Sequence, residues 1–205
     1  MKKDSILYVV VFTFVISAIF VTGLALANEG TKDRVAANRE LTSQAAVLGA
    51  LGISYGNPDE AKTLYAAAVT PIADASPRAY RATVDGSSFL AVEQSGAGLW
   101  GTITVIVAAD PAGDRIRGVQ VVSQNETPGL GGRIEESWFL DQFRNEASAK
   151  GIKVTSGAES KGTGDVNPDN GLVDGITGAS RTSSAFESII NAALARVRAV
   201  AGGAL

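Results

Sequence analysis

Glycines and hydroxyl side chains crowd one segment, 173-VDGITGASRTSSAF-186, which joins a polar loop to the last helical pattern of the chain. Gly175 and Gly178 allow a close backbone approach or unusual dihedral angles. Four hydroxyl side chains follow where the predicted helix starts: Ser180, Thr182, Ser183 and Ser184. Free backbone N–H groups and the helix dipole attract an anion at such a start. The pattern therefore predicts a niche the size of a phosphate group.

Helix capping is the alternative interpretation of these hydroxyl groups. Ser184 and Glu187 have the spacing of a capping box, in which a serine and a glutamate satisfy two backbone N–H groups at a helix start. One capping box uses one of the four hydroxyl groups. Capping alone therefore leaves three of them without an explanation, and we favour the anion site.

Several kinds of chemistry are excluded by composition. The chain has no cysteine and no histidine, which removes disulfides, thiol redox chemistry, the usual zinc and haem sites, and nucleophiles activated by histidine. A redox role would therefore need a bound organic cofactor. A net charge of -3 without a long basic run argues against nucleic acid as a partner.

The polar loop before the glycine-rich segment has some features of a calcium site. Asp165, Asn167 and Asp169 alternate as the first ligands of an EF-hand loop do. However, Asn170 stands at the glycine position and Ile176 at the position of the bidentate glutamate. We therefore predict an unliganded polar loop, with no metal site.

The amino-terminal residues that precede the domain have the composition of a membrane span. Residues 5–28 carry no charge and are long enough as a helix to cross a hydrocarbon core of about 30 Å. The small residues of Ala25-Leu26-Ala27 would also suit a signal-peptide cleavage site. The apolar stretch is longer than a usual signal-peptide core, so we favour a retained anchor.

The remaining chain reads as helices, then strands, then helices. Helical patterns cover residues 31–53, with Gly52 at the end, and 57–69, with Asn57 as cap and Pro58 at the first position. Alternating patterns predict strands, whereas later segments return to helix, short strand and helix. The predicted strands are 79–84, 87–93, 98–109, 115–124 and 151–157, and the later helices are 135–147 and about 182–200.

These elements predict an α+β fold: an amino-terminal transmembrane helix followed by one domain with an antiparallel sheet and flanking helices. We expect a cytoplasmic tip and transmembrane anchor at 1–28, linking helices at 29–70 and the functional domain at 71–205.

The segment Asp174–Thr182, DGITGASRT, resembles the flavinylation motif D-G-x-[ST]-G-A-[ST]-x-T of the FMN-binding domain family. That family includes the covalent-flavin subunits of the Rnf complex and of the sodium-pumping NADH:quinone reductase, Nqr. The resemblance implies that a separate magnesium-dependent flavin transferase joins FMN covalently to Thr182 through a phosphoester. Ser180 stands where threonine is more usual, a departure that the pattern permits. The other implied binding residues of this segment are Asp174, Gly175, Thr177, Gly178, Ala179, Ser180 and Ser183.

A second segment, 125-NETPGLGGRI-134, is similar to the E-T-P-G-L-G sequence of the same subunits. The resemblance adds five candidate cofactor-binding residues: Glu126, Thr127, Gly129, Leu130 and Gly131. A tight turn after an edge strand explains these residues almost as well as contact with the flavin ring. Trp100 and Trp138 could flank the ring, but large aromatic side chains are more often part of the core, which we favour.

The two motif segments and the single amino-terminal span together resemble those of membrane-bound subunits that relay electrons. The resemblance implies a single-pass protein of the inner or plasma membrane with its domain on the extracytoplasmic, periplasmic side. Electrons would pass to and from other subunits of an ion-translocating complex, and the domain would not be catalytic alone. Membership of an Rnf or an Nqr complex stays open. The alternative is a membrane-anchored, non-redox binding or structural domain whose glycine- and serine-rich segment only caps a helix.

Overall fold

A computed structural model describes residues 5–155 and 164–203. The chain forms two compact units, residues 1–41 and 42–205. The expected cytoplasmic tip at residues 1–4 and the part of the polar loop at 156–163 lie outside the described residues. The functional boundaries that we expect at residues 28 and 70 stay predictions.

The predicted membrane span and the helix predicted after it are one continuous helix, α1 (Ile6–Leu51). In the described part of the chain, α1 is the one helix long and apolar enough to cross a membrane, judged by length and composition, properties that a signal sequence shares. It ends where the sequence predicts. Gly52 adopts φ +75°, a conformation that glycine reaches at little cost, and the Ile53 N–H donates to the Leu48 carbonyl oxygen at 2.9 Å.

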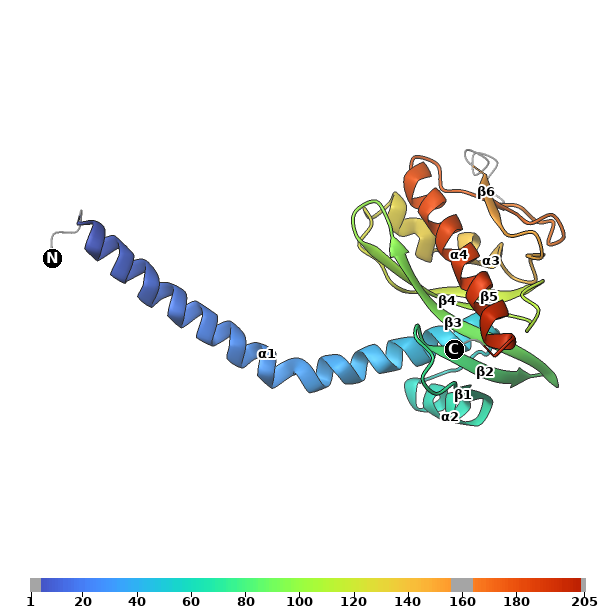
Figure 1. Cartoon of the computed structure of the whole chain (residues 1–205), viewed down its shortest axis with the longest axis horizontal. Helices are drawn as coiled ribbons and strands as arrows, with labels where there is room; N and C mark the ends of the chain where they lie inside the picture. Colours follow the sequence, from blue (N-terminus) through green and yellow to red (C-terminus); the bar gives the residue numbers. More distant parts are fainter. Residues whose placement is uncertain (1–4, 156–163, 204–205) are drawn as a thin grey trace. The chain divides into compact units, whose positions relative to one another are not determined.

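The second unit is built on an antiparallel sheet with the order β1-β2-β3-β4-β5 in the described residues. Figure 1 shows this arrangement, which confirms the predicted α+β fold class. The strands are β1 (Val69–Pro71), β2 (Ala79–Val84), β3 (Ser87–Ala97), β4 (Thr102–Ala109) and β5 (Ile116–Ser123). Before them, α2 (Pro58–Ala68) begins as predicted, because the Asn57 side chain accepts from the Glu60 N–H.

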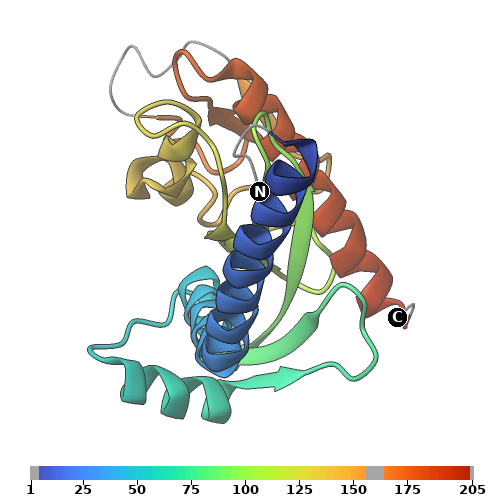
Figure 2. The ribbon, with the colours of Figure 1, turned by 90° about the vertical axis from the view of Figure 1, so that its left-hand side faces the viewer.

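Both faces of the sheet are covered. On one face, Val92, Val105 and Val107 pack with apolar residues of α4 (Ser180–Ala201), which lies alongside β3 in Figures 1 and 2. On the other face, Ala91, Ile106 and Ala108 pack in a separate cluster with the last turns of α1 and with α2. Coverage on both sides explains why β4 is an almost uninterrupted apolar run rather than an alternating one.

The helix predicted at 135–147 is wrong for most of its length. Its first residue is the last of a 3₁₀ turn, η1 (Gly131–Glu135), and only a short helix, α3 (Ser137–Asp141), follows. The chain then turns, and Asn145 adopts φ +58°, a left-handed conformation that a continuing α-helix excludes. The strand predicted at 151–157 is described as β6 (Lys153–Thr155), which pairs in parallel with β7 (Leu172–Asp174).

Aromatic packing fixes the start of α4 relative to the sheet. Phe186, in the second turn of the helix, is fully buried and lies edge-on to Phe139 of α3 at a ring-centroid distance of 5.2 Å. Phe143 contacts both rings. These contacts hold the first turn of α4, and therefore Thr182, beside the segment that follows β5.

Candidate functional site

Thr182 lies in the first turn of α4 and is 1% exposed. Its Oγ1 donates a hydrogen bond to Oε2 of Glu126 at 2.5 Å. The two residues are 56 positions apart in the chain, so the fold itself joins the two segments that the sequence singled out. A hydroxyl group that only caps a helix would be exposed at the helix start. Thr182 is buried instead.

Glu126 follows β5 and is 4% exposed, although it is a carboxylate. Its Oε1 accepts from the backbone N–H groups of Leu99 and Trp100, each at 2.9 Å. Burial by itself raises the pKa of Glu126, but the Thr182 hydroxyl and the backbone N–H groups of the β3–β4 turn outweigh burial and hold the pKa below its ordinary value. The carboxylate is therefore ionised at neutral pH.

Glycines make room for the Glu126–Thr182 pair. A methyl group added at Gly131 would lie 2.6 Å from Oγ1 of Thr182 and 2.9 Å from Oε2 of Glu126. One added at Gly98 would lie 2.5 Å from Oε1 of Glu126. Real carbon atoms do not approach oxygen that closely. Gly131 is therefore required by the buried pair, a role that the sequence did not predict for it.

The second motif segment forms a tight turn over the first. The Thr127 carbonyl oxygen accepts from the Leu130 and Gly132 N–H groups at 3.1 and 3.0 Å, and Gly129 adopts φ +74°. Leu130 Cδ2 lies 3.3 Å from the position of a methyl group added at Gly178. The two glycine-rich segments are thus neighbours, while the side chain of Thr127 stays exposed.

The remaining motif residues split into a buried group that fixes the loop and an exposed group. Asp174 Oδ1 accepts from the Thr155 hydroxyl at 3.2 Å, and the Gly175 N–H donates to the Thr155 carbonyl oxygen at 2.7 Å. The Ser183 Oγ accepts from the Ile176 N–H at 3.1 Å. Four residues of this motif are exposed: Thr177, Gly178, Ser180 and Arg181.

The capping box of Ser184 and Glu187, the alternative interpretation of the hydroxyl groups, does not form. Ala179 is the N-cap residue of α4 and offers no side-chain acceptor to the helix. Ser184 lies inside the helix, and Glu187 Oε2 accepts from the Val154 N–H at 2.7 Å instead. The helix start therefore keeps backbone N–H groups without a side-chain cap, which suits an anion.

Exposed apolar side chains belong to the segments around the buried pair. Leu99 is 45%, Trp100 71% and Leu130 46% exposed. Our preference for Trp100 in the core is therefore wrong: this residue sits in the tight β3–β4 turn, where the backbone faces Glu126 and leaves the ring outside. Trp138 is half-buried at the edge of the core, with the Arg133 guanidinium 5.4 Å from its ring centroid.

The polar loop is organised by its own side chains. Asp165 Oδ1 accepts from the Asn167 N–H and Asn167 Oδ1 from the Asp169 N–H, at 2.7 and 3.1 Å. Asp169 also pairs with Arg115 at 2.6 Å. Among the described residues, no group of acidic side chains has the arrangement of a metal site.

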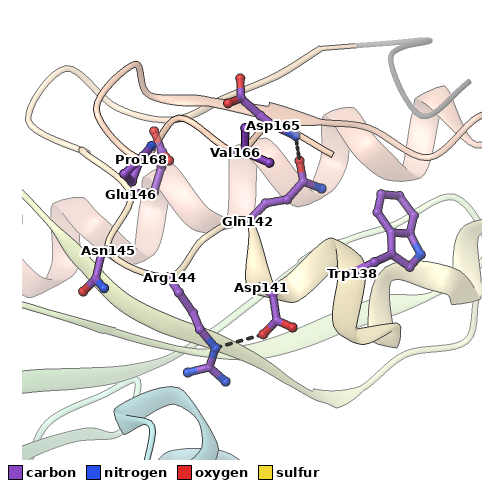
Figure 3. Close-up of a pocket in the computed structure, with 9 residues that line it drawn as sticks. All are labelled: Trp138, Asp141, Gln142, Arg144, Asn145, Glu146, Asp165, Val166 and Pro168. Atoms are coloured by element: carbon purple, nitrogen blue, oxygen red, sulfur yellow. Dashed lines mark hydrogen bonds and ion pairs between the residues drawn. The ribbon is translucent and has the colours of Figure 1, made fainter. Parts of the chain in front are cut away.

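A cleft of about 440 Å³ lies beside this loop, and Figure 3 shows the side chains that line it. Gln142 spans two parts of the chain there: its Oε1 accepts from the Asp165 and Asp174 N–H groups at 2.7 and 2.8 Å. Sequence reasoning missed this cleft, because its walls come from α3, the turn after it and the polar loop. The lining residues are Trp138, Asp141, Gln142, Arg144, Asn145, Glu146, Asp165, Val166 and Pro168. Neither Thr182 nor Glu126 is among them.

Comparison with protein families bears directly on the segments that meet at Thr182. Residues 98–195 match the model of the FMN-binding domain. The matched range includes the β3–β4 turn, Glu126, the polar loop and the first turns of α4. Both motif segments therefore lie in the part of the chain that is similar to FMN-binding domains.

Curated relatives are identical to this chain at about a third of the aligned positions. The NqrC subunit of the Na(+)-translocating NADH-quinone reductase of Vibrio alginolyticus is 33% identical over 134 residues, which are 58% of this chain and 50% of that protein. The equivalent protein of Yersinia pestis is 33% identical over 101 residues, 47% of this chain and 36% of that protein. The chain therefore spans half or less of the length of these relatives.

Solved structures show the same fold. The crystal structure of Shewanella oneidensis NqrC has a TM-score of 0.66 and 21% identity, covering 80% of this chain and 99% of that one. The crystal structure of the equivalent Na(+)-translocating NADH-quinone reductase protein from Parabacteroides distasonis has a TM-score of 0.61 and 22% identity, covering 80% of this chain and 92% of that one.

Two features of the site suit the phosphate and the ring of FMN, and a third concerns the direction of the Thr182 hydroxyl group. The uncapped start of α4 can receive the phosphate, and the exposed Leu99, Trp100 and Leu130 can face an apolar ring. The hydroxyl group of Thr182, by contrast, is turned inward toward Glu126.

Proposed function

We propose that this chain is the membrane-anchored, covalent-FMN subunit of an ion-translocating redox complex of the Rnf or Nqr type. FMN is joined to Thr182 through a phosphoester by a flavin transferase, and it relays electrons between neighbouring subunits. A flavin exchanges one or two electrons, which this chain could not do with its own side chains, since it has no cysteine or histidine.

The observation that carries the proposal is the meeting of two distant motif segments at one hydroxyl group. The Asp174–Thr182 segment and the Glu126–Gly131 segment both lie in the range that matches the FMN-binding domain, and they meet at the Thr182–Glu126 hydrogen bond. A helix that needed only a cap would not require a buried carboxylate held by two further backbone N–H groups.

The curated relatives favour an Nqr-type complex over an Rnf complex. The matching proteins of Vibrio alginolyticus and Yersinia pestis are both NqrC subunits of the Na(+)-translocating enzyme. The partners of this chain would then be the other subunits of a membrane complex, and α1 would hold it at the inner or plasma membrane with the domain on the periplasmic side.

Covalent attachment tests the proposal. We expect wild-type protein, produced together with an active flavin transferase, to gain the mass of one FMN and to keep its yellow fluorescence after denaturation. Thr182→Ala should gain no flavin mass. Ser188→Ala is the matched control, because Ser188 is an exposed hydroxyl of the same helix outside the motif, and it should be flavinylated like wild type. A colourless wild-type protein would favour the non-redox binding domain instead.

A further inference from the structure

The hydrogen bond between Thr182 and Glu126 has a direction that matters for chemistry. Glu126 is ionised and therefore can only accept, so the hydroxyl proton of Thr182 points at Oε2 of Glu126. The lone pairs of Oγ1 are then directed away from the carboxylate. An alcohol held in this way is oriented as a nucleophile, with a proton acceptor already at 2.5 Å.

Glu126 cannot easily turn away from this arrangement. Its other oxygen, Oε1, is held by the Leu99 and Trp100 N–H groups at 2.9 Å each. Gly98 and Gly131 make room for the carboxylate in this position, because methyl groups added at these glycines would lie 2.5 Å from Oε1 and 2.9 Å from Oε2. The orientation of Thr182 is therefore set by a preorganised carboxylate rather than by solvent.

We propose that Glu126 acts as the general base for flavin attachment to Thr182, a role that rests on the function proposed above. Oγ1 of Thr182 attacks the phosphorus of an activated FMN, a phosphoanhydride of the flavin nucleotide. The Oγ1–phosphorus bond forms and the phosphoanhydride bond breaks, so that the other phosphate leaves with the bonding electron pair. The proton of Oγ1 passes to Oε2 of Glu126.

This assignment differs from a purely structural role. A structural carboxylate would only fill space and satisfy the Leu99 and Trp100 N–H groups, which a glutamine could also do through its carbonyl oxygen. Glutamine would then direct its NH₂ group at Oγ1 of Thr182. That group donates and does not accept, so the hydroxyl would lose its proton acceptor while the surrounding packing stayed the same.

The experiment measures flavin transfer to the whole chain by a flavin transferase, with flavin adenine dinucleotide as the phosphoanhydride. The initial rate of covalent FMN gain, followed by intact mass, is recorded against acceptor concentration for wild type, Glu126→Gln and Glu126→Asp. We expect kcat to fall about 100-fold or more in Glu126→Gln with KM unchanged, as loss of a general base predicts. Glu126→Asp keeps a carboxylate and should recover part of this loss. Glu135→Gln is the matched control, an exposed glutamate at the end of η1, and should behave like wild type.

The results that would contradict the role of Glu126 differ from those that would contradict the function proposed above. A Glu126→Gln protein flavinylated at the wild-type kcat would overturn the role of Glu126 and leave Thr182 as the attachment site. A raised KM at unchanged kcat, or a lost near-ultraviolet circular dichroism signal, would show a structural role and likewise overturn it. Wild-type protein that gains no FMN would overturn both proposals.

Discussion

The hydrogen bond from Thr182 to Glu126 joins the residue proposed to carry FMN to the core of the domain. Glu126 is 4% exposed and relies on donors from Thr182, Leu99 and Trp100. A buried carboxylate that loses a donor destabilises the fold by about 1–3 kcal/mol. Thr182→Ala should therefore lower the free energy of unfolding by that amount, besides losing the flavin, whereas Ser188→Ala should not. Chemical denaturation of the unflavinylated proteins measures both values.

A substitution at Gly131 tests the packing around this bond. A methyl group in Gly131→Ala would lie 2.6 Å from Oγ1 of Thr182 and would push the hydroxyl and Glu126 apart. We expect a loss of about 1–3 kcal/mol in unfolding free energy, as for other overpacked sites, together with slower flavin attachment. Unfolding curves and intact mass give the two readouts.

The neighbouring glycine supplies the control for that substitution. A methyl group at Gly132 would lie 3.3 Å from the nearest atom, the Thr127 carbonyl oxygen, so Gly132→Ala should be the milder change. Equal effects of the two substitutions would show that the space beside Thr182 is not what Gly131 provides.

At the scale of elements, the polar loop is tied to the sheet by a second buried carboxylate. Glu146 is 2% exposed, and its Oε1 accepts from the Gly171 N–H at 2.6 Å. Its backbone carbonyl oxygen accepts from the Ile116 N–H of β5 at 2.9 Å. This residue therefore joins β5 to the loop that leads into β7 and the start of α4.

Burial raises the pKa of Glu146, and the nearby carboxylates of Asp165 and Asp169 add to that effect, against the Gly171 N–H and Arg115. A pKa raised on folding gives stability that is complete below the unfolded pKa and lost as pH rises through the folded pKa. The free energy of unfolding of wild type minus that of Glu146→Gln should thus decrease as the pH rises above the ordinary glutamate pKa of about 4. Glu135→Gln controls for the loss of one exposed carboxylate in the same denaturation series, and a pH-independent difference for Glu146→Gln would contradict the prediction.

At the scale of the molecule, the two faces of the sheet pack against different helices. One face packs against α4, which carries Thr182, and the other against the last turns of α1, whose earlier residues have the composition of a membrane span. The same helix that we expect in the membrane thus ends as part of the domain core. In the function proposed above, a tether of this kind would keep FMN near the membrane complex.

The topology of the anchor gives the last prediction. The prediction is that residues 6–27 stay as a membrane helix and that the domain is periplasmic. A reporter enzyme that works only outside the cytoplasm should then be active when it is fused after Leu205. The mature protein should also begin at Met1 or Lys2, because an anchor is not cleaved. Reporter activity and amino-terminal sequencing check the two points. A soluble protein that begins at Asn28 would establish a signal peptide instead.

Local signals in the sequence were sufficient for much of the fold. The cap at Asn57, the helix end at Gly52 and the central strands depend on propensities and patterns within a few residues, and the structure confirms them. The motif segments were likewise visible in the sequence, because their glycines and hydroxyl groups have a fixed spacing. The short α3 was not predicted, since the left-handed turn at Asn145 opposes an otherwise helical pattern.

The environment of Thr182 was decided by tertiary structure alone. Its burial, its bond to Glu126 and the requirement for glycine at position 131 arise where α4, the segment after β5 and the β3–β4 turn meet. No local pattern encodes a contact between residues 56 positions apart. The sequence by itself therefore determined which residue types could hold a flavin phosphate. The meeting of these three segments determined that the hydroxyl proposed to bind it is buried against a carboxylate.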